Sequence, residues 1–220
     1  MKSRRTYAAT AAAAVALLFS LQLLAADKLA ITDDGLVPIA VRNIDKAWIR
    51  PGASLKGYTS VMIRPVSVAF NKNWNPRDYG VFGLKSDEVE HLRAELAKLA
   101  TSTFGRVLSK GGYTLSTAPG ENVLEVQADI VDLVVNGVEP RDAGNIHVFV
   151  TSAGEMRLLL SLRDSVTGTT LYRTSDFKRG QEHDRLEWAN SVFNRAEAAR
   201  ALDGWAHQLK SALDGAKSAP

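Results

Sequence analysis

The sequence predicts an α+β fold, a two-layer sandwich in which a mixed sheet of about five strands has two helices packed on one face. Three observations predict this class. Residues 154–180 read as two long strands joined by a turn, while residues 86–110 and 186–213 carry apolar side chains at helical spacing. Further strand patterns lie before and after the first helix, so strands and helices do not simply alternate.

The first 26 residues have the layout of a secretory signal. Basic residues lie within 2–5, an apolar run follows over 8–26, and a polar segment begins after Ala26. We expect cleavage after Ala26, although the run is also long enough to stay as a membrane anchor. Arg4 and Arg5 resemble a twin-arginine signal, but adjacent arginines are ordinary at the start of Sec signals. We therefore expect Sec export to the periplasm.

Charge and cysteine content exclude several classes of protein. The chain has 220 residues and a net charge of +3, and its leader holds Lys2, Arg4 and Arg5 without any acidic residue. Removing the leader leaves +3 minus 3, a net charge of 0, so we expect no nucleic-acid partner. There is no cysteine, which excludes disulfides and a lipid anchor attached through cysteine.

The segment before the main domain reads as an extended arm over residues 27–57. Gly35 and Pro38 interrupt its apolar residues, and a short strand pattern at 47–50 ends at a turn. We expect one domain over 58–215 and a flexible tail over 216–220. The first strong strand covers 58–70, where Pro65 separates two sets of apolar positions and predicts a bulge or an edge position.

The loop over residues 71–86 contains aromatic and arginine side chains, which are common anchors for partners. Its four candidates are Trp74, Arg77, Tyr79 and Phe82. In one interpretation they form a partner-binding loop. In another, Trp74 and Phe82 fold back and cover the end of the core. A third interpretation places a small-ligand or enzyme pocket at the same loop.

The remaining elements follow from periodicity. Ser86 suits a helix start, and Gly111-Gly112 end the helix. One face of this helix carries an apolar stripe, which consists of Val89, Leu92, Leu96, Leu99, Thr103 and Val107. Strands are expected at 113–117, 123–135 and 146–150. The second of these shifts its apolar parity, which predicts a bulge or burial on both faces. One long C-terminal helix, or two collinear ones, should start at 186 and end near Gly215.

Several stretches together resemble the bacterial family named domain of unknown function 3313. They begin with Ile49-Arg50-Pro51-Gly52-Ala53 and Tyr58 to Ile63, followed by Gly112 to Leu115, Leu162 to Gly168, and Asp203-Gly204-Trp205-Ala206. The resemblance covers essentially the whole mature chain. It implies an exported envelope protein and supplies no activity, cofactor or catalytic residue.

No motif in the sequence identifies an active site. The four histidines have no partner at metal-ligand spacing, and His183 between Glu182 and Asp184 is the best metal candidate, although neighbouring side chains point apart. Asp129 and Asp132 have opposite strand parity, which argues against a paired-carboxylate site. We therefore expect no catalytic residue, no metal and no cofactor.

The functional hypothesis is a periplasmic binding or envelope-assembly module that is not an enzyme. Its expected partner is another envelope protein or a peptide, with membrane contact only if the leader is kept. Peptide binding by strand addition at a sheet edge is a variant of this hypothesis. The alternative is a small-ligand carrier or enzyme with its site at the loop from Asn71 to Phe82.

Overall fold

The computed structural model describes residues 32–75, 77, 84–136, 149–150, 152–181, 187–188 and 191–218. The predicted leader at 1–26 lies outside these residues. The elements are β1 (Val37–Ile39), β2 (Lys46–Ile49), β3 (Ser60–Ile63), β4 (Ser67–Phe70), α1 (Ser86–Lys110), β5 (Thr114–Leu115), β6 (Val123–Val135), β7 (Phe149–Val150), β8 (Gly154–Asp164), β9 (Thr170–Arg179), β10 (Glu187–Trp188) and α2 (Ser191–Ser218).

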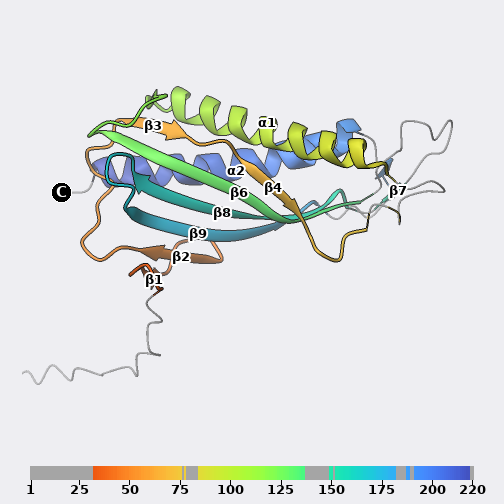
Figure 1. The fold of residues 1–220 in the computed structure, drawn as a ribbon, viewed down its shortest axis with the longest axis horizontal. Helices are drawn as coiled ribbons and strands as arrows, with labels where there is room; N and C mark the ends of the chain where they lie inside the picture. Colours follow the sequence, from red (N-terminus) through yellow and green to blue (C-terminus); the bar gives the residue numbers. More distant parts are fainter. Residues whose placement is uncertain are drawn as a thin grey trace, which may run out of the picture.

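The fold class is α+β, as the sequence predicts, with a mixed sheet and two helices (Figure 1). The main sheet has the order β1-β2-β9-β8-β6-β3-β5, with β4 paired to β6 off this path. It thus has eight strands rather than about five. β1 and β2, with three and four residues, lie in the segment predicted to be an extended arm, and the predicted strand over 58–70 divides into β3 and β4. β5 lies within the short strand predicted at 113–117.

The strands β8 and β9 form the predicted antiparallel ribbon, with Leu160 opposite Thr174 and Leu162 opposite Tyr172. Its turn is held by Asp164, whose carboxylate accepts hydrogen bonds from the backbone N–H of Val166 at 3.1 Å and Thr167 at 2.7 Å. Acceptor side chains at the start of a turn act in this way. The ribbon joins the N-terminal strands to the rest of the sheet.

Pro65 ends one strand before the next begins. β3 stops at Ile63 and β4 starts at Ser67, and both pair parallel to β6. The predicted single strand over 58–70 is therefore two strands, because proline has no N–H for the ladder. The predicted bulge in the long strand is confirmed: the β6–β8 register shifts between Val131 and Val134, and Asp132 has a positive φ of 53°.

The two helices run in the same direction and lie side by side (Figure 1). α1 begins at Ser86, one residue earlier than an N-cap at Ser86 would imply. Lys85 is the N-cap in extended conformation, and its backbone N–H donates to the Glu88 carboxylate at 2.9 Å. A glutamate at the third position of a helix commonly closes its N-terminus in this way.

The bounds of α2 differ from the prediction at both ends. Glu187 and Trp188, predicted to be helical, form β10 and pair with β7 in a separate two-stranded sheet. At the other end the helix continues past Gly215 to Ser218, through residues predicted to form a flexible tail. Asp214 supports this last turn, because it accepts from Lys210 at 2.5 Å and from the Tyr113 hydroxyl at 2.9 Å.

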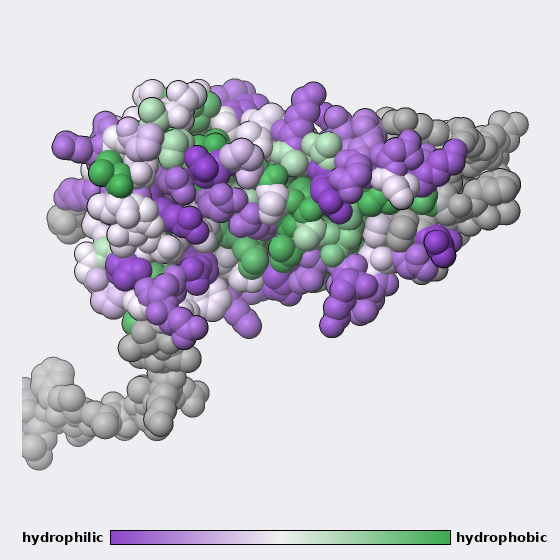
Figure 2. Space-filling view, in the orientation of Figure 1, coloured by the Kyte–Doolittle hydropathy of each residue, from purple (hydrophilic) through white to green (hydrophobic). Residues whose placement is uncertain are grey.

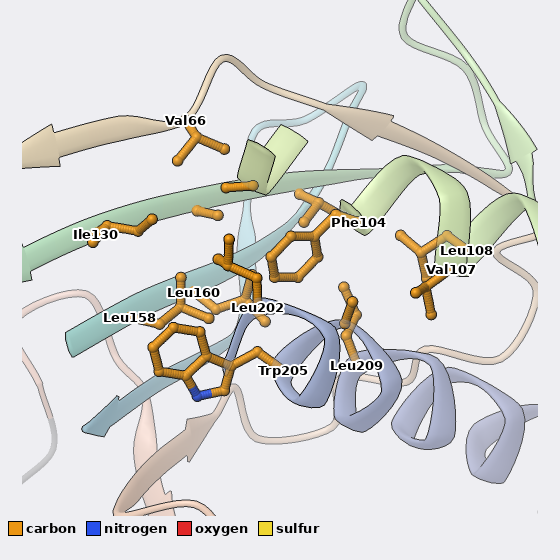
Figure 3. Close-up of a cluster of buried hydrophobic side chains, with 14 of the residues drawn as sticks. Val66, Phe104, Val107, Leu108, Ile130, Leu158, Leu160, Leu202, Trp205 and Leu209 are labelled. Atoms are coloured by element: carbon orange, nitrogen blue, oxygen red, sulfur yellow. The ribbon is translucent and has the colours of Figure 1, made fainter. Parts of the chain in front are cut away.

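One hydrophobic core fills the space between the sheet and the two helices. Figure 3 shows Phe104 of α1, Trp205 and Leu202 of α2, and Leu158 and Leu160 of β8 pointing toward one another. These side chains are almost completely buried. Alternate residues of the sheet face this core, as the period-two pattern predicts.

The surface is mainly hydrophilic on the face seen in Figure 2, with apolar side chains gathered in a strip near its middle. Among the described residues, the large apolar side chains that are exposed are Leu115, Leu159 and Val166. Scattered apolar residues of this kind are normal on a protein surface. Among the same residues, no helix is long and apolar enough to cross a membrane.

A helix-lined groove as candidate binding site

A groove with a volume of about 840 Å³ lies between the first halves of α1 and α2, above one end of the sheet. We call it the helix groove. Its walls are Leu84 with α1 from Glu88 to Leu99, and α2 from Asn194 to Ala201. Its floor is formed by Leu133 to Val135, Ala153 to Met156 and Lys178 to Gln181. This volume lies within the usual range of small-molecule binding sites.

The wall from α1 is the first half of the apolar stripe that the sequence predicts. Thr103 and Val107, in the second half of the stripe, are buried in the core, whereas Leu92, Leu96 and Leu99 are only half-buried and line the groove. Apolar side chains on a helix normally pack against a neighbouring element. In the first half of α1, Leu96 and Leu99 pack only partly against the core, and they also line the groove.

The wall from α2 explains why this space exists. From residue 202 onward α2 fills the core with Leu202, Trp205 and Leu209. In its first half it presents Ala198 and Ala201 to the groove. Alanine side chains are too short to reach the sheet, and protein cores leave few voids of this size unless small residues create them.

The floor of the groove depends on a close backbone approach. Gly154 has a φ of +129°, and a Cβ atom there would lie 2.0 Å from the carbonyl oxygen of Val134. Only glycine fits this position, because other residues rarely adopt this φ and the Cβ would clash. The adjacent end of β9 is tied down by the Gly180 N–H, which donates to the Gly154 carbonyl at 2.8 Å.

The charged side chains around the groove neutralise one another. Glu197 is buried, and it accepts hydrogen bonds from Arg200 at 2.5 Å and from the Gln181 backbone N–H at 3.1 Å. Arg179 pairs with Glu155 at 2.9 Å. Among the described residues, the groove therefore has an apolar interior and a rim with as many basic as acidic side chains, which suits an apolar ligand better than an ion.

One ion pair crosses from wall to wall. Arg195 of α2 and Glu95 of α1 lie 3.1 Å apart, nitrogen to oxygen, and both line the groove. We call this pair the Glu95–Arg195 bridge. A second pair, Arg106 with Asp203 at 2.6 Å, links the same two helices outside the groove.

Asn194 is a polar side chain in the wall that has an unused hydrogen-bonding atom. Its Oδ1 is buried and has no hydrogen-bond partner among the described residues. Buried polar atoms are nearly always satisfied in folded proteins, so this acceptor oxygen in the groove wall can take a hydrogen bond from a donor group.

The predicted partner-binding loop lies only partly within the described residues. Trp74 stacks on Phe70 with ring centroids 4.3 Å apart, and its Nε1 donates to the Val135 carbonyl at 3.2 Å. Trp74 therefore lies over the end of the sheet, as expected if the loop folds back to cover the core. Arg77 is exposed, and Tyr79 and Phe82 lie outside the described residues.

Other predicted site residues do not come together. Asp129 accepts from Ser67 at 2.6 Å, and Asp132 pairs with Arg157 at 3.4 Å. The candidate metal site at Glu182 to Asp184 lies outside the described residues. Within the described ranges no group of three or more histidine or acidic side chains is placed to hold a metal ion.

Sequence reasoning missed the helix groove. The available signal was the fall in side-chain size along α2, from Leu202 and Trp205 to Ala198 and Ala201. That signal is weak, because alanine is also the best helix-forming residue and needs no other explanation.

The fold and the groove define a class: an α+β domain whose two parallel helices enclose an apolar groove over the end of a mixed sheet. The chain belongs to the family described as Protein of unknown function (DUF3313), whose model matches residues 30–209. This confirms the resemblance noted from the sequence. No curated protein matches the chain.

Solved structures with a similar arrangement are distant in sequence. XCC0632 from Xanthomonas campestris, of the DUF330 family, is 12% identical, with 78% of this chain and 89% of that chain covered and a TM-score of 0.42. The PelC dodecamer from Paraburkholderia phytofirmans is 13% identical, with 69% and 90% covered and a TM-score of 0.34. A putative lipoprotein from Caulobacter crescentus is 16% identical, with 74% and 96% covered and a TM-score of 0.34.

Proposed function

We propose that this chain is an exported protein of the cell envelope that binds a ligand in the helix groove and catalyses no reaction. The observation that carries the proposal is the groove itself: an apolar interior of about 840 Å³ between two helices of one domain. The leader with its basic start and apolar run supports export. Three ion pairs join charged residues of the rim: Arg179 with Glu155, Arg195 with Glu95, and Arg200 with Glu197.

The export part of the proposal is tested by fractionation. The full chain should appear in the periplasm or in the envelope fraction, with Sec the expected route. A matched chain that begins at Asp27 should stay in the cytosol. Finding the full chain in the cytosol would contradict export.

The binding part is tested with an apolar dye whose fluorescence rises in a nonpolar environment. The purified chain from residue 27 should bind the dye at one saturable site, and Ala198→Phe should abolish most of the signal by filling the groove. Ala196→Phe is the matched control, since Ala196 is exposed on the same helix. A broad hydrolase screen of the same preparation should show no turnover, and a turnover that survives repurification would contradict the non-enzymatic assignment.

A protein or peptide partner remains part of the proposal, but strand addition has little support. Of the two strands that end the sheet order, β1 contains Pro38, which has no N–H to donate, and β5 has only two residues. Short strands and prolines protect sheet edges from pairing with other chains. We therefore place the first binding site in the groove rather than at these edges.

A further inference from the structure

We propose that the ligand of the helix groove is an uncharged, mainly apolar small molecule that donates a hydrogen bond to Asn194 through a hydroxyl or an N–H group. This inference rests on the proposed binding function and names the class of its ligand. Three properties of the described lining residues carry it: the apolar surface that they offer, the pairing of their charged side chains, and the unpaired acceptor atom of Asn194.

The apolar lining determines the body of the ligand. Leu96 and Leu99 of α1 and Met156 of β8 line the groove, and Ala198 and Ala201 line it from α2. Apolar surface of this kind gains free energy when an apolar molecule displaces water from it. The volume of about 840 Å³ is in the range of sites that take small molecules. The body of the ligand is therefore a hydrocarbon or aromatic group.

The charged side chains of the groove favour an uncharged ligand. Of the eight lysine, arginine and glutamate side chains among the described lining residues, six form the three ion pairs named above. Lys178 lies 3.9 Å from Asp176, and the Glu88 carboxylate accepts a hydrogen bond from the Lys85 backbone N–H at 2.9 Å. An ionised ligand would thus leave water without a free counter-charge to meet it, which costs far more free energy than the transfer of a neutral group.

Asn194 determines the polar group of the ligand. It lies in the first turn of α2 and lines the groove, and its Oδ1 is buried without a hydrogen-bond partner within the described part of the chain. A carboxamide oxygen only accepts hydrogen bonds, so a carboxylate or an ether oxygen cannot pair with it, whereas a hydroxyl or an N–H group can. The torsion that orients a carboxamide is broad, so the oxygen can turn to meet a donor in the groove.

One donor group also fits a small molecule better than a peptide. Each peptide residue brings a backbone N–H and a C=O that need partners when they leave water. At the edge of the floor the backbone N–H groups are already used, since Gly180 donates to the Gly154 carbonyl and Gln181 donates to the Glu197 carboxylate. A small molecule with a single hydroxyl or N–H group needs only the acceptor that Asn194 offers.

The first test uses molecules that share one alkyl chain and differ only in their polar end. Dodecanol, dodecyl methyl ether, dodecanoate and dodecylammonium compete with the apolar dye for the purified chain from residue 27, all below the concentrations at which they form micelles. We expect dodecanol to displace the dye at a concentration about fivefold lower than the ether, the factor that one ordinary hydrogen bond gives. Both ions should compete at least about tenfold more weakly than dodecanol.

The second test assigns the preference for the alcohol to Asn194. In Asn194→Leu the alcohol and the ether should compete within about twofold of each other, because the acceptor is gone. Asn194→Asp keeps acceptor oxygens in the same shape and should keep the preference. Ala196→Phe, at an exposed position of the same helix, is the control and should also keep it. Circular dichroism verifies folding, and the ratio of alcohol to ether within each variant does not depend on a general change in affinity.

The outcomes separate this inference from the proposed function. Equal competition by alcohol and ether, stronger competition by either ion, or a preference that persists in Asn194→Leu would overturn the inference. If dye binding is still lost in Ala198→Phe, the chain remains a groove-binding protein. The same holds if an apolar peptide displaces the dye and none of the alkyl compounds does. Absence of any dye binding that depends on Ala198 would overturn both.

Discussion

Asp176 is a buried carboxylate that joins three parts of the protein. It lies in β9, accepts a hydrogen bond from the Trp205 indole N–H at 2.7 Å, and accepts a second from the Asp45 backbone N–H at 3.0 Å. Lys178 lies 3.9 Å away. A buried charge is tolerated only when partners of this kind surround it, so Asp176 is a structural link between the N-terminal strands, the sheet and α2.

Replacing Asp176 with asparagine tests this link. Asp176→Asn keeps the shape but turns one acceptor oxygen into an NH₂ group that faces a donor, so the free energy of unfolding should fall by about 1–3 kcal/mol. Urea unfolding followed by circular dichroism measures it. Glu121→Gln makes the same chemical change at an exposed position and should have almost no effect. Equal stability of the two variants would show that Asp176 does not hold the fold together.

Two tyrosines predict how stability depends on pH. Burial, together with the Asp164 carboxylate that accepts its hydrogen bond at 2.8 Å, raises the pKa of Tyr58 to about 12. Burial and the Asp214 carboxylate likewise raise the pKa of Tyr113. The unfolded value is about 10, so the fold favours the neutral phenols. Their contribution to the free energy of unfolding is complete below pH about 10 and is lost as the pH rises through their raised folded-state pKa values.

We therefore expect the free energy of unfolding to fall steeply above pH about 10, and to fall less steeply in the Tyr58→Phe, Tyr113→Phe double variant. At neutral pH each single substitution should cost about 0.5–1.5 kcal/mol for its lost hydrogen bond. Urea unfolding at several pH values measures both effects. A double variant with the same alkaline slope as the original chain would contradict the assignment to these phenols.

At the scale of elements, the join between β6 and β8 is built around one glycine and one bulge. Asp132 at positive φ shifts the register of β6, and Gly154 at the start of β8 lies against the Val134 carbonyl. The two features bring the strand ends together to form the floor of the groove. Strained backbone of this kind persists only where its surroundings hold it.

Two glycine-to-alanine substitutions should have opposite effects. Gly154→Ala forces a Cβ to within 2.0 Å of the Val134 oxygen at a φ of +129°, so we expect a loss of more than about 2 kcal/mol. Gly215→Ala lies in α2 with no atom near the new Cβ, so it should gain about 0.5–1 kcal/mol. Thermal unfolding compares them directly, and a gain in both would show that the close approach at Gly154 is not rigid.

At the scale of the whole molecule, the N-terminal segment is part of the sheet rather than an appendage. β2 pairs with β9 through Lys46 to Ile49, and β1 pairs with β2. Leu36 is completely buried, and Arg173 of β9 binds the Asp34 carboxylate at 2.5 Å. These contacts cover the edge of β9 that faces away from β8.

A chain that starts at residue 58 should therefore be less stable than one that starts at residue 27. Removing β1 and β2 exposes the backbone edge of β9, and long uncovered edges pair with other chains. We expect a lower urea midpoint and concentration-dependent oligomers in size-exclusion chromatography. If the shorter chain stays monomeric with an unchanged midpoint, the N-terminal strands contribute nothing to the fold.

The sequence by itself determined the fold class, the family, the β8–β9 ribbon and most of α1. These depend on local periodicity and turn chemistry, which a single chain displays directly: alternating apolar residues in β8, the Asp164 turn, and the stripe that begins at Val89. Export was likewise predicted from the leader alone and stays a prediction.

Only the tertiary structure decided the number of strands, the role of residues 32–50 and the existence of the helix groove. β1 is too short to have a period, and it is a strand because β2 supplies its hydrogen bonds. The groove arises where Leu96 on one helix faces Ala198 on another over the sheet. The helix groove depends on how side chains from elements far apart in the chain fill the space between them. No local pattern of residues predicts that.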